Sequence, residues 1–279
     1  MLWGYANGWY PEFLARDDDE LYAKLKFLLA HGLQETGVPL EDVAALPEGE
    51  RARLGEFLEE NDLHLTPYVG YDYVNAGEDE ARSATEEICE GLQRYGPMLR
   101  AWCVFTNARA GHRFDRSVPV EEKIERLCTR LRPLAAACHQ MGMPLGINNQ
   151  GDFYCHEFAE MCERTPHLFV HLDTANIYWA GERFWPAFET VAPHVIATHW
   201  RDERVLIGQR KPRGVALKNC AMGEGDVPLR RAYTHLLEVA PRPDRLVMEI
   251  EMFSPPEMTH AECLEKTLAF VRSLEEETT

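Results

Sequence analysis

The chain has 279 residues, of which 45% are hydrophobic and 27% charged, and its formal net charge is -17. This composition is globular, and the length suits one α/β barrel of about 250 residues or two smaller domains. Strong negative charge without a basic stripe disfavours nucleic acid and anionic membranes as partners. The sequence has no 18-residue apolar span and no signal-like N-terminus, so we expect a cytoplasmic enzyme.

Eight cysteines are scattered along the chain without a CxxC pair. Several fall inside helical patterns, as Cys128 and Cys138 do. Reduced, buried thiols are therefore favoured over a zinc cluster or a disulfide framework.

Segments with strand and helix periodicity alternate along the chain. The predicted strands are 2–5, 32–36, 63–68, 99–105, 144–148, 168–173, 194–199 and 245–250. The predicted helices are 17–29, 47–61, 78–95, 120–141, 156–164, 184–192, 226–239 and 259–276, with a long loop near 200–225. Because parallel strands need crossovers and helices usually supply them, this alternation predicts a (β/α)8 TIM barrel. No composition shift marks a linker, so residues 1–279 are predicted to form a single domain.

Polar side chains lie at the ends of the last four predicted strands. These residues are Asn148, Asp173, His199 and Glu249. The carboxyl ends of parallel strands meet at one edge, where ligands bind. An oxygen-rich set with one imidazole suits a Mn, Mg, Co or Zn ion with open positions, and argues against a closed structural zinc site.

Four motifs in a fixed order resemble the xylose isomerase-like TIM-barrel superfamily. They are 173–176 (DTAN) with 180–182 (AGE), 198–202 (THWRD), 223–227 (GEGDV) and 247–251 (VMEIE). That superfamily contains sugar isomerases and epimerases, cyclitol dehydratases and apurinic endonucleases. The resemblance is strongest over residues 120–260 and implies a barrel that binds a divalent metal, with Mn²⁺ as the first choice.

The resemblance also implies the metal ligands. In the ketose epimerases of this group a Glu, an Asp, a His and a Glu on strands five to eight hold the ion, and Asp173, His199 and Glu249 match the last three. Strand five departs, because residues 147–152 (INNQGD) place Asn148 where the group commonly has Glu. An Asn carbonyl can ligate a hard cation but cannot act as a base, which argues against epimerisation by two Glu residues.

Alternatives remain open for several site residues. Glu251 shares a strand face with Glu249 and is the rival ligand, and His171 points to the same side as Asp173. His171 is either a catalytic helper or a core histidine. With Asn148 neutral, the proton carriers are predicted among Glu249, His171, Asp152, loop carboxylates and a metal-bound hydroxide.

Further residues near the strand ends are predicted to contact substrate. These are Asn148, Gln150, Asn176, Trp200 and Asp202. Aromatic residues on the same side, such as Trp9 and Trp179, suit sugar stacking and ordinary packing equally well. The basic residues of the 200–225 loop, Arg201 among them, are predicted to be solvated charges rather than an anion clamp.

The leading hypothesis is a divalent-metal-dependent isomerase, epimerase or lyase acting on a sugar, keto-sugar or cyclitol through an enediolate-type intermediate. Its partner would be a small polyhydroxylated molecule, and a homo-oligomer is compatible with the sequence. Asn148 supports a second hypothesis, a barrel that lost catalysis and serves as a binding or partner subunit. An apurinic endonuclease is disfavoured, because strands three and four offer no suitable extra histidine and the net charge is wrong for DNA.

Overall fold

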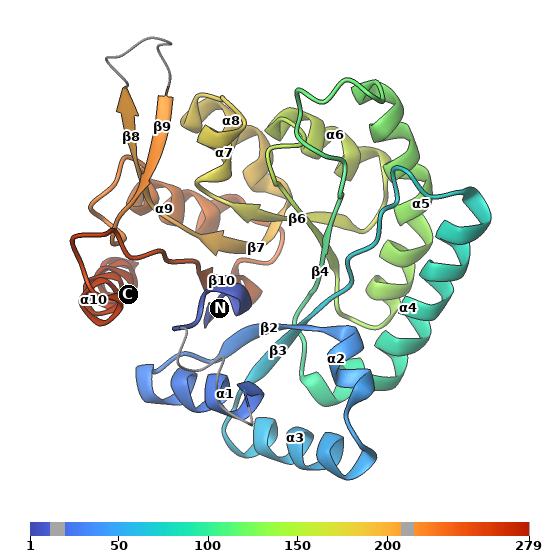
Figure 1. The fold of residues 1–279 in the computed structure, drawn as a ribbon, viewed down its shortest axis with the longest axis horizontal. Coiled ribbons are helices and arrows are strands. Elements are labelled where there is room, and N and C mark those ends of the chain that lie inside the picture. The colour runs from blue at the N-terminus through green and yellow to red at the C-terminus, as the bar shows by residue number, and fades with distance from the viewer. Residues whose placement is uncertain (12–19, 208–214, 279) are drawn as a thin grey trace.

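The computed structural model describes residues 1–11, 20–207 and 215–278. Within them, parallel strands close into a barrel in the order β1-β10-β7-β6-β5-β4-β3-β2, and helices surround it (Figure 1). The barrel strands are β1 (Leu2–Tyr5), β2 (Glu35–Pro39), β3 (His64–Tyr68), β4 (Val104–Asn107), β5 (Leu145–Asn148), β6 (Leu168–Asp173), β7 (Val195–Trp200) and β10 (Val247–Ile250). The predicted (β/α)8 TIM barrel is confirmed.

Helices follow the strands on the outside of the barrel (Figure 1). They are α1 (Glu20–His31), α2 (Leu40–Ala45), α3 (Glu48–Glu60), α4 (Glu78–Leu99), α5 (Val120–Gln140), α6 (Cys155–Arg164), α7 (Asn176–Trp179), α8 (Phe184–Val191), α9 (Leu229–Val239) and α10 (His260–Thr278). Among the residues described, none of these helices is long and apolar enough to cross a membrane.

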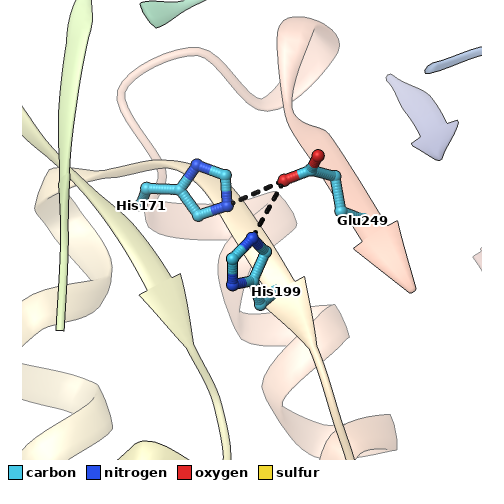
Figure 2. A group of neighbouring side chains, drawn as sticks. All are labelled: His171, His199 and Glu249. Atoms are coloured by element: carbon cyan, nitrogen blue, oxygen red, sulfur yellow. Dashed lines mark ion pairs between the residues drawn. The ribbon is translucent and has the colours of Figure 1, made fainter. Parts of the chain in front are cut away.

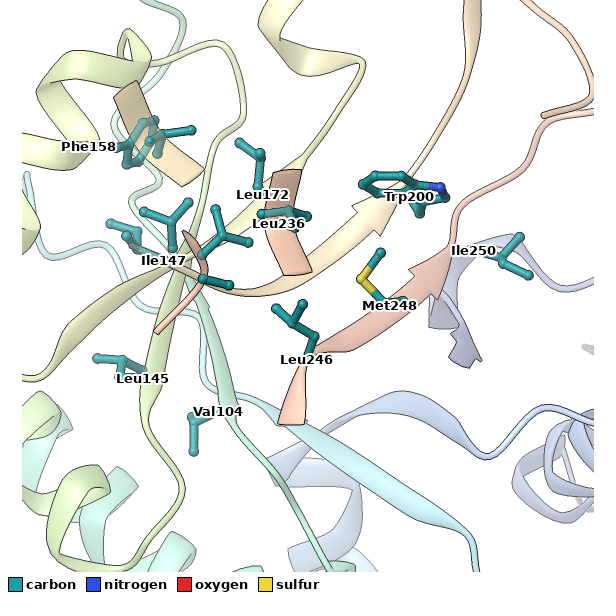
Figure 3. Close-up of a cluster of buried hydrophobic side chains, with 14 of the residues drawn as sticks. Val104, Leu145, Ile147, Phe158, Leu172, Trp200, Leu236, Leu246, Met248 and Ile250 are labelled. Atoms are coloured by element: carbon teal, nitrogen blue, oxygen red, sulfur yellow. The ribbon is translucent and has the colours of Figure 1, made fainter. Parts of the chain in front are cut away.

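The main core lies between the barrel and its helices. Strand residues such as Leu145, Ile147 and Leu172 point outward and are fully buried (Figure 3). Phe158 of α6 and Leu236 of α9 meet this layer from the helix side. Because these apolar side chains fill the space outside the strands, the inward positions near the carboxyl ends are free to carry polar groups.

The second and fourth strands lie further along the chain than predicted. The predicted strand 99–105 begins inside α4, which continues to Leu99 and ends where Arg100 adopts a left-handed φ of 55°. β4 starts only at Val104, because Leu99 packs on the buried face of the helix and extends its apolar pattern. Likewise, β2 starts at Glu35, after a turn in which Gly32 has a φ of 71°.

Two other predicted segments also differ from the structure. The predicted loop 200–225 contains two antiparallel strands, β8 (Glu203–Ile207) and β9 (Val215–Asn219), which pair with each other outside the barrel (Figure 1). The first predicted helix starts at residue 17, outside the described residues, and α1 is described from Glu20.

Candidate metal centre

Strand register sets the heights of the inward-facing polar residues. Asp173 pairs with His199 across β6 and β7, and His199 pairs with Glu249 across β7 and β10. In a TIM barrel with a shear of about 8, adjacent strands are offset in height by about one residue, and alternate strands supply each layer. β10 lies two strands from β6, so the height shifts by about two residues between them. Asp173 is therefore level with Glu251, and His171 is level with Glu249.

Two groups of potential ligands follow this layering around His199. The upper group is Asp173, Nδ1 of His199 and Glu251, and the lower group is His171, Nε2 of His199 and Glu249. In each group the ligand atoms lie within 4.8 Å of one another. The expected set of Asp173, His199 and Glu249 is thus divided between two layers, and the rival Glu251 is the carboxylate that lies near Asp173.

The upper group forms part of a pocket of about 770 Å³ at the carboxyl end of the barrel. Asp173, His199 and Glu251 all line it. The other polar residues predicted from the sequence that line it are Asn148, Gln150, Asp152 and Asn176. The structure therefore brings together most of the predicted site.

Trp200 and Asp202 do not have the predicted role. Because His199 points into the barrel, the next side chain points outward, and Trp200 is fully buried near Tyr233 of α9. Asp202 anchors a loop, since its carboxylate accepts hydrogen bonds from the backbone N–H groups of Gly223, Gly225 and Val227. Both residues shape the surroundings of the site rather than the pocket wall.

Aromatic side chains divide between the pocket and the core. The pocket is lined by Trp9, Tyr68, Phe105, Trp179 and Phe253. Trp9 and Trp179 remain 39% and 51% exposed, so part of each ring is accessible to solvent at the pocket. Trp3, in contrast, is buried in the core.

Arg201 lies at the pocket and is not a solvated loop charge. Its Nη1 donates to Oε1 of Glu251 at 2.8 Å, and its Nη2 lies 3.4 Å from Oδ2 of Asp173. Nη2 also donates to Oδ1 of Asn176 at 2.7 Å. The sequence-based prediction was wrong for Arg201 because proximity to the β7 end buries it, whereas Arg204 stays half exposed.

Amide side chains frame the floor of the pocket. Nδ2 of Asn148 donates to the carbonyl oxygen of His171 at 2.9 Å, while its Oδ1 is buried and has no hydrogen-bond partner among the described residues. Asn149 bonds the backbone of Asp173 through both ends of its amide, at 2.6 and 3.0 Å. These contacts fix β5 against β6 and leave one carbonyl acceptor free.

Burial and close charges shift the pKa values of the upper group. Burial raises the pKa of Asp173 to about 7, although Arg201 opposes this shift. Burial also opposes ionisation of Glu251, but hydrogen bonding to His199 and the charge of Arg201 outweigh it and lower that pKa. For His199, hydrogen bonding to Glu249 and Glu251 outweighs burial and raises the pKa well above its usual value.

The sequence-based predictions missed Glu35, a fully buried carboxyl group inside the barrel. Burial, together with the nearby charge of Glu249, raises its pKa well above the ordinary value. The neighbouring strand makes room for it, because a Cβ at Gly4 would lie 2.2 Å from Oε2 of Glu35. The available signal was Gly4 in the first strand, because a strand glycine often marks a place where another group approaches the backbone closely. The glycine does not show which residue that group belongs to.

The upper group fits a divalent cation. Its surroundings hold the carboxylates of Asp173, Glu203 and Glu251 against the guanidinium of Arg201, which pairs with all three. An excess of buried negative charge is costly unless a cation or protons balance it. The side-chain carbonyl oxygen of Asn148, which has no hydrogen-bond partner in the part of the chain that the structure describes, adds a neutral oxygen of the kind that hard cations accept.

A comparison with protein families assigns the chain to one of them. The family described as "Xylose isomerase-like TIM barrel" matches residues 25–274. The chain belongs to this family. The match begins within α1, ends within α10 and includes both groups around His199.

Three individual proteins illustrate what the chain is similar to. The uncharacterized protein YihM of Escherichia coli strain K12 is 30% identical over 98 residues, which are 34% of this chain and 29% of that protein. The matched stretch thus spans less than a third of the relative.

The structure of an L-ribulose 3-epimerase superposes with a TM-score of 0.72 at 16% identity, over 99% of this chain and 95% of the other. The structure of the IOLI protein with a bound zinc atom superposes with a TM-score of 0.68 at 13% identity, over 98% of both chains. At these identities the likeness shows the fold.

Proposed function

We propose that this protein is a divalent-metal-dependent isomerase, epimerase or lyase that acts on a polyhydroxylated carbonyl compound. The observation that carries the proposal is the convergence of Asp173, His199 and Glu251 on one pocket at the carboxyl end of the barrel. Solved structures of similar fold include sugar epimerases, a probable dehydratase and a zinc-bound protein, which supports this class.

Three side chains would hold the cation: Asp173, Glu251 and His199 through Nδ1, with Oδ1 of Asn148 as an additional oxygen. When bound there, a divalent ion polarises neighbouring carbonyl and hydroxyl oxygens and makes the adjacent carbon acid stronger. Arg201 supplies fixed positive charge to the same floor, since it is held by Glu251 and Asn176. It would favour negative charge that develops on substrate oxygens.

Asp152 is the proposed proton carrier. It lines the pocket, and burial raises its pKa to about 6. Its Oδ1 accepts hydrogen bonds from the backbone N–H groups of Gln150 and Phe153, which orient the carboxyl group. A base with a pKa near the working pH combines a large ionised fraction with useful basicity. Asn148 cannot serve, and His171 lies below the floor with no exposed surface.

The mouth of the pocket supports a sugar-like substrate. Trp9 and Trp179 are partly exposed there and offer flat faces that stack on the apolar side of a sugar ring. A single proton carrier is compatible with isomerisation or with elimination of a leaving group. We therefore favour these reactions over epimerisation by two carriers on opposite faces.

Hydrogen exchange at carbon tests the proposal even when the product is unidentified. Ketoses, keto-glycosides and keto-cyclitols would be incubated with the Mn²⁺-loaded protein in D₂O and followed by proton NMR. We expect deuterium to enter at the carbon next to the carbonyl, and Asp152→Asn to abolish this exchange. Arg204→Gln, at an exposed position, is the matched control and should exchange normally. Binding of these compounds without any exchange would instead support the binding-subunit hypothesis.

A further inference from the structure

The lower group forms a closed cluster beneath the pocket. Nε2 of His171 lies 3.1 Å from Oε2 of Glu249, and Nε2 of His199 lies 3.3 Å from the same oxygen (Figure 2). His171 and Glu249 are fully buried, and neither lines the pocket. The two imidazoles thus point at one carboxylate oxygen from neighbouring strands.

His199 connects this cluster with the upper group through its second nitrogen. Nδ1 lies 3.0 Å from Oε2 of Glu251, on the pocket side, while Nε2 faces Glu249. To ligate a cation, His199 must be neutral, and a neutral imidazole carries one N–H, so only the other nitrogen has a lone pair for the cation. The position of that proton therefore decides which group His199 can serve.

A buried N–H needs an acceptor. If Nδ1 of His199 ligates a cation in the upper group, the proton resides on Nε2, inside the barrel and out of contact with water. Oε2 of Glu249, 3.3 Å from Nε2, is then the carboxylate oxygen close enough to accept it after a small adjustment of the ring. Metal-ligating histidines commonly donate their second N–H to a carboxylate, which fixes the ring and its tautomer. Without Glu249 the proton would move to Nδ1, where Glu251 accepts it, and the lone pair would turn away from the pocket.

His171 completes the arrangement from the other side. It approaches Glu249 at 3.1 Å, and its ring packs edge to face against Phe105 with centroids 4.8 Å apart. Phe105 also stacks on His199, with centroids 5.6 Å apart and planes at 27°. Phe105 thus packs against both imidazole rings that approach Glu249.

We propose that Glu249, held in place by His171, is a positioning residue that keeps the proton of His199 on Nε2 and so reserves Nδ1 for a cation in the upper group. This inference rests on the proposed function, because it requires a cation in the upper group. It gives Glu249 and His171 a role that involves no contact with substrate.

Binding of Mn²⁺ to the purified, metal-free protein tests the inference, with affinity measured by calorimetry. Glu249→Met keeps the length of the side chain but removes the acceptor, and we expect Mn²⁺ affinity to fall by about 10- to 100-fold. Glu249→Gln restores an acceptor oxygen and should bind within a few-fold of the wild type. His171→Leu should weaken binding to a lesser extent than Glu249→Met.

A matched control separates this effect from general damage to the barrel. Glu35→Gln alters another fully buried carboxyl group of the barrel interior and should leave Mn²⁺ affinity within about twofold, since its neutral form is already favoured by burial. Thermal unfolding of each variant shows whether it is folded. Glu249→Met binding as tightly as the wild type would overturn the inference.

Crystals of the wild-type protein soaked in Mn²⁺ give a readout that does not depend on any variant. Anomalous density next to Asp173, Nδ1 of His199 and Glu251 supports the inference. Density between His171, Nε2 of His199 and Glu249 overturns it, because Glu249 would then be a ligand, while metal dependence itself would stand. Wild-type protein that binds no divalent ion overturns both the inference and the proposed metal dependence.

Discussion

The two groups around His199 differ in access and in charge balance, although they share one imidazole. The upper group meets the pocket, and Arg201 offsets part of its negative charge. The lower group is closed, and the ion pairs of Glu249 there are with two histidines. Hydrogen bonds to these imidazoles outweigh the effect of burial and lower the pKa of Glu249 to about 2. A separation of two residues at a strand end, as between Glu249 and Glu251, can therefore change the role of a carboxylate.

The largest expected effect is a loss of turnover when Asp152, on the pocket side, is replaced. Asp152→Asn should lower kcat by about 10²- to 10⁴-fold, the range that general acid–base groups contribute. Mn²⁺ affinity should stay unchanged, because Asp152 belongs to neither donor group. Steady-state kinetics with any substrate found by deuterium exchange checks this. A variant that retains full turnover would remove Asp152 from the mechanism.

In the closed interior of the barrel, added side-chain volume should lower the stability of the fold. Gly4→Ala would place a Cβ 2.5 Å from the backbone oxygen of Glu35 as well as close to its carboxylate. Backbone cannot yield as a flexible side chain can, so we expect a loss of about 3 kcal/mol in unfolding free energy. Urea denaturation measures it. Gly8→Ala is the control, since a Cβ there would meet nothing within 4 Å and should cost far less.

The alternation of strands and helices was sufficient to predict the barrel, and several of the residues predicted at strand ends line the pocket at its carboxyl end. Strand periodicity placed Glu249 and Glu251 on one face but could not assign their heights, which depend on the shear of the closed barrel. It could have shown that Trp200 points away from His199. The burial of Arg201 and the position of Glu35 beside Gly4 depend on packing between distant segments.

Stability should depend on pH through Asp152. Burial raises its pKa to about 6 from an ordinary value of 3.8, so the folded protein holds this proton more tightly than the unfolded chain. The contribution to stability is complete below the unfolded pKa and is lost as pH rises through about 6. It amounts to roughly 2–3 kcal/mol. Urea unfolding should therefore show that the unfolding free energy of Asp152→Asn, relative to that of the wild type, rises by this amount from pH 4 to pH 7. A difference between variant and wild type that does not change with pH would contradict the pKa shift.

A smaller effect on Mn²⁺ affinity is expected from Arg201, the positive charge beside the upper group. Arg201→Met removes a guanidinium that pairs with Asp173 and Glu251, so Mn²⁺ should bind about tenfold more tightly, a change of about 1.4 kcal/mol. Calorimetry at constant ionic strength measures this change. Arg204→Met, at a half-exposed position, should leave the affinity unaltered. Weaker binding after loss of Arg201 would mean that it organises the carboxylates more than it competes with the ion.

The central claim is that the upper group holds the cation. Its most direct test is a paired titration of Glu251→Gln and Glu249→Gln with Mn²⁺, two isosteric changes separated by one residue at the carboxyl end of β10. We predict a loss of at least about 100-fold for Glu251→Gln, which removes a charged ligand, and only a few-fold loss for Glu249→Gln. The reverse order, with Glu249→Gln abolishing binding and Glu251→Gln retaining it, would contradict the claim.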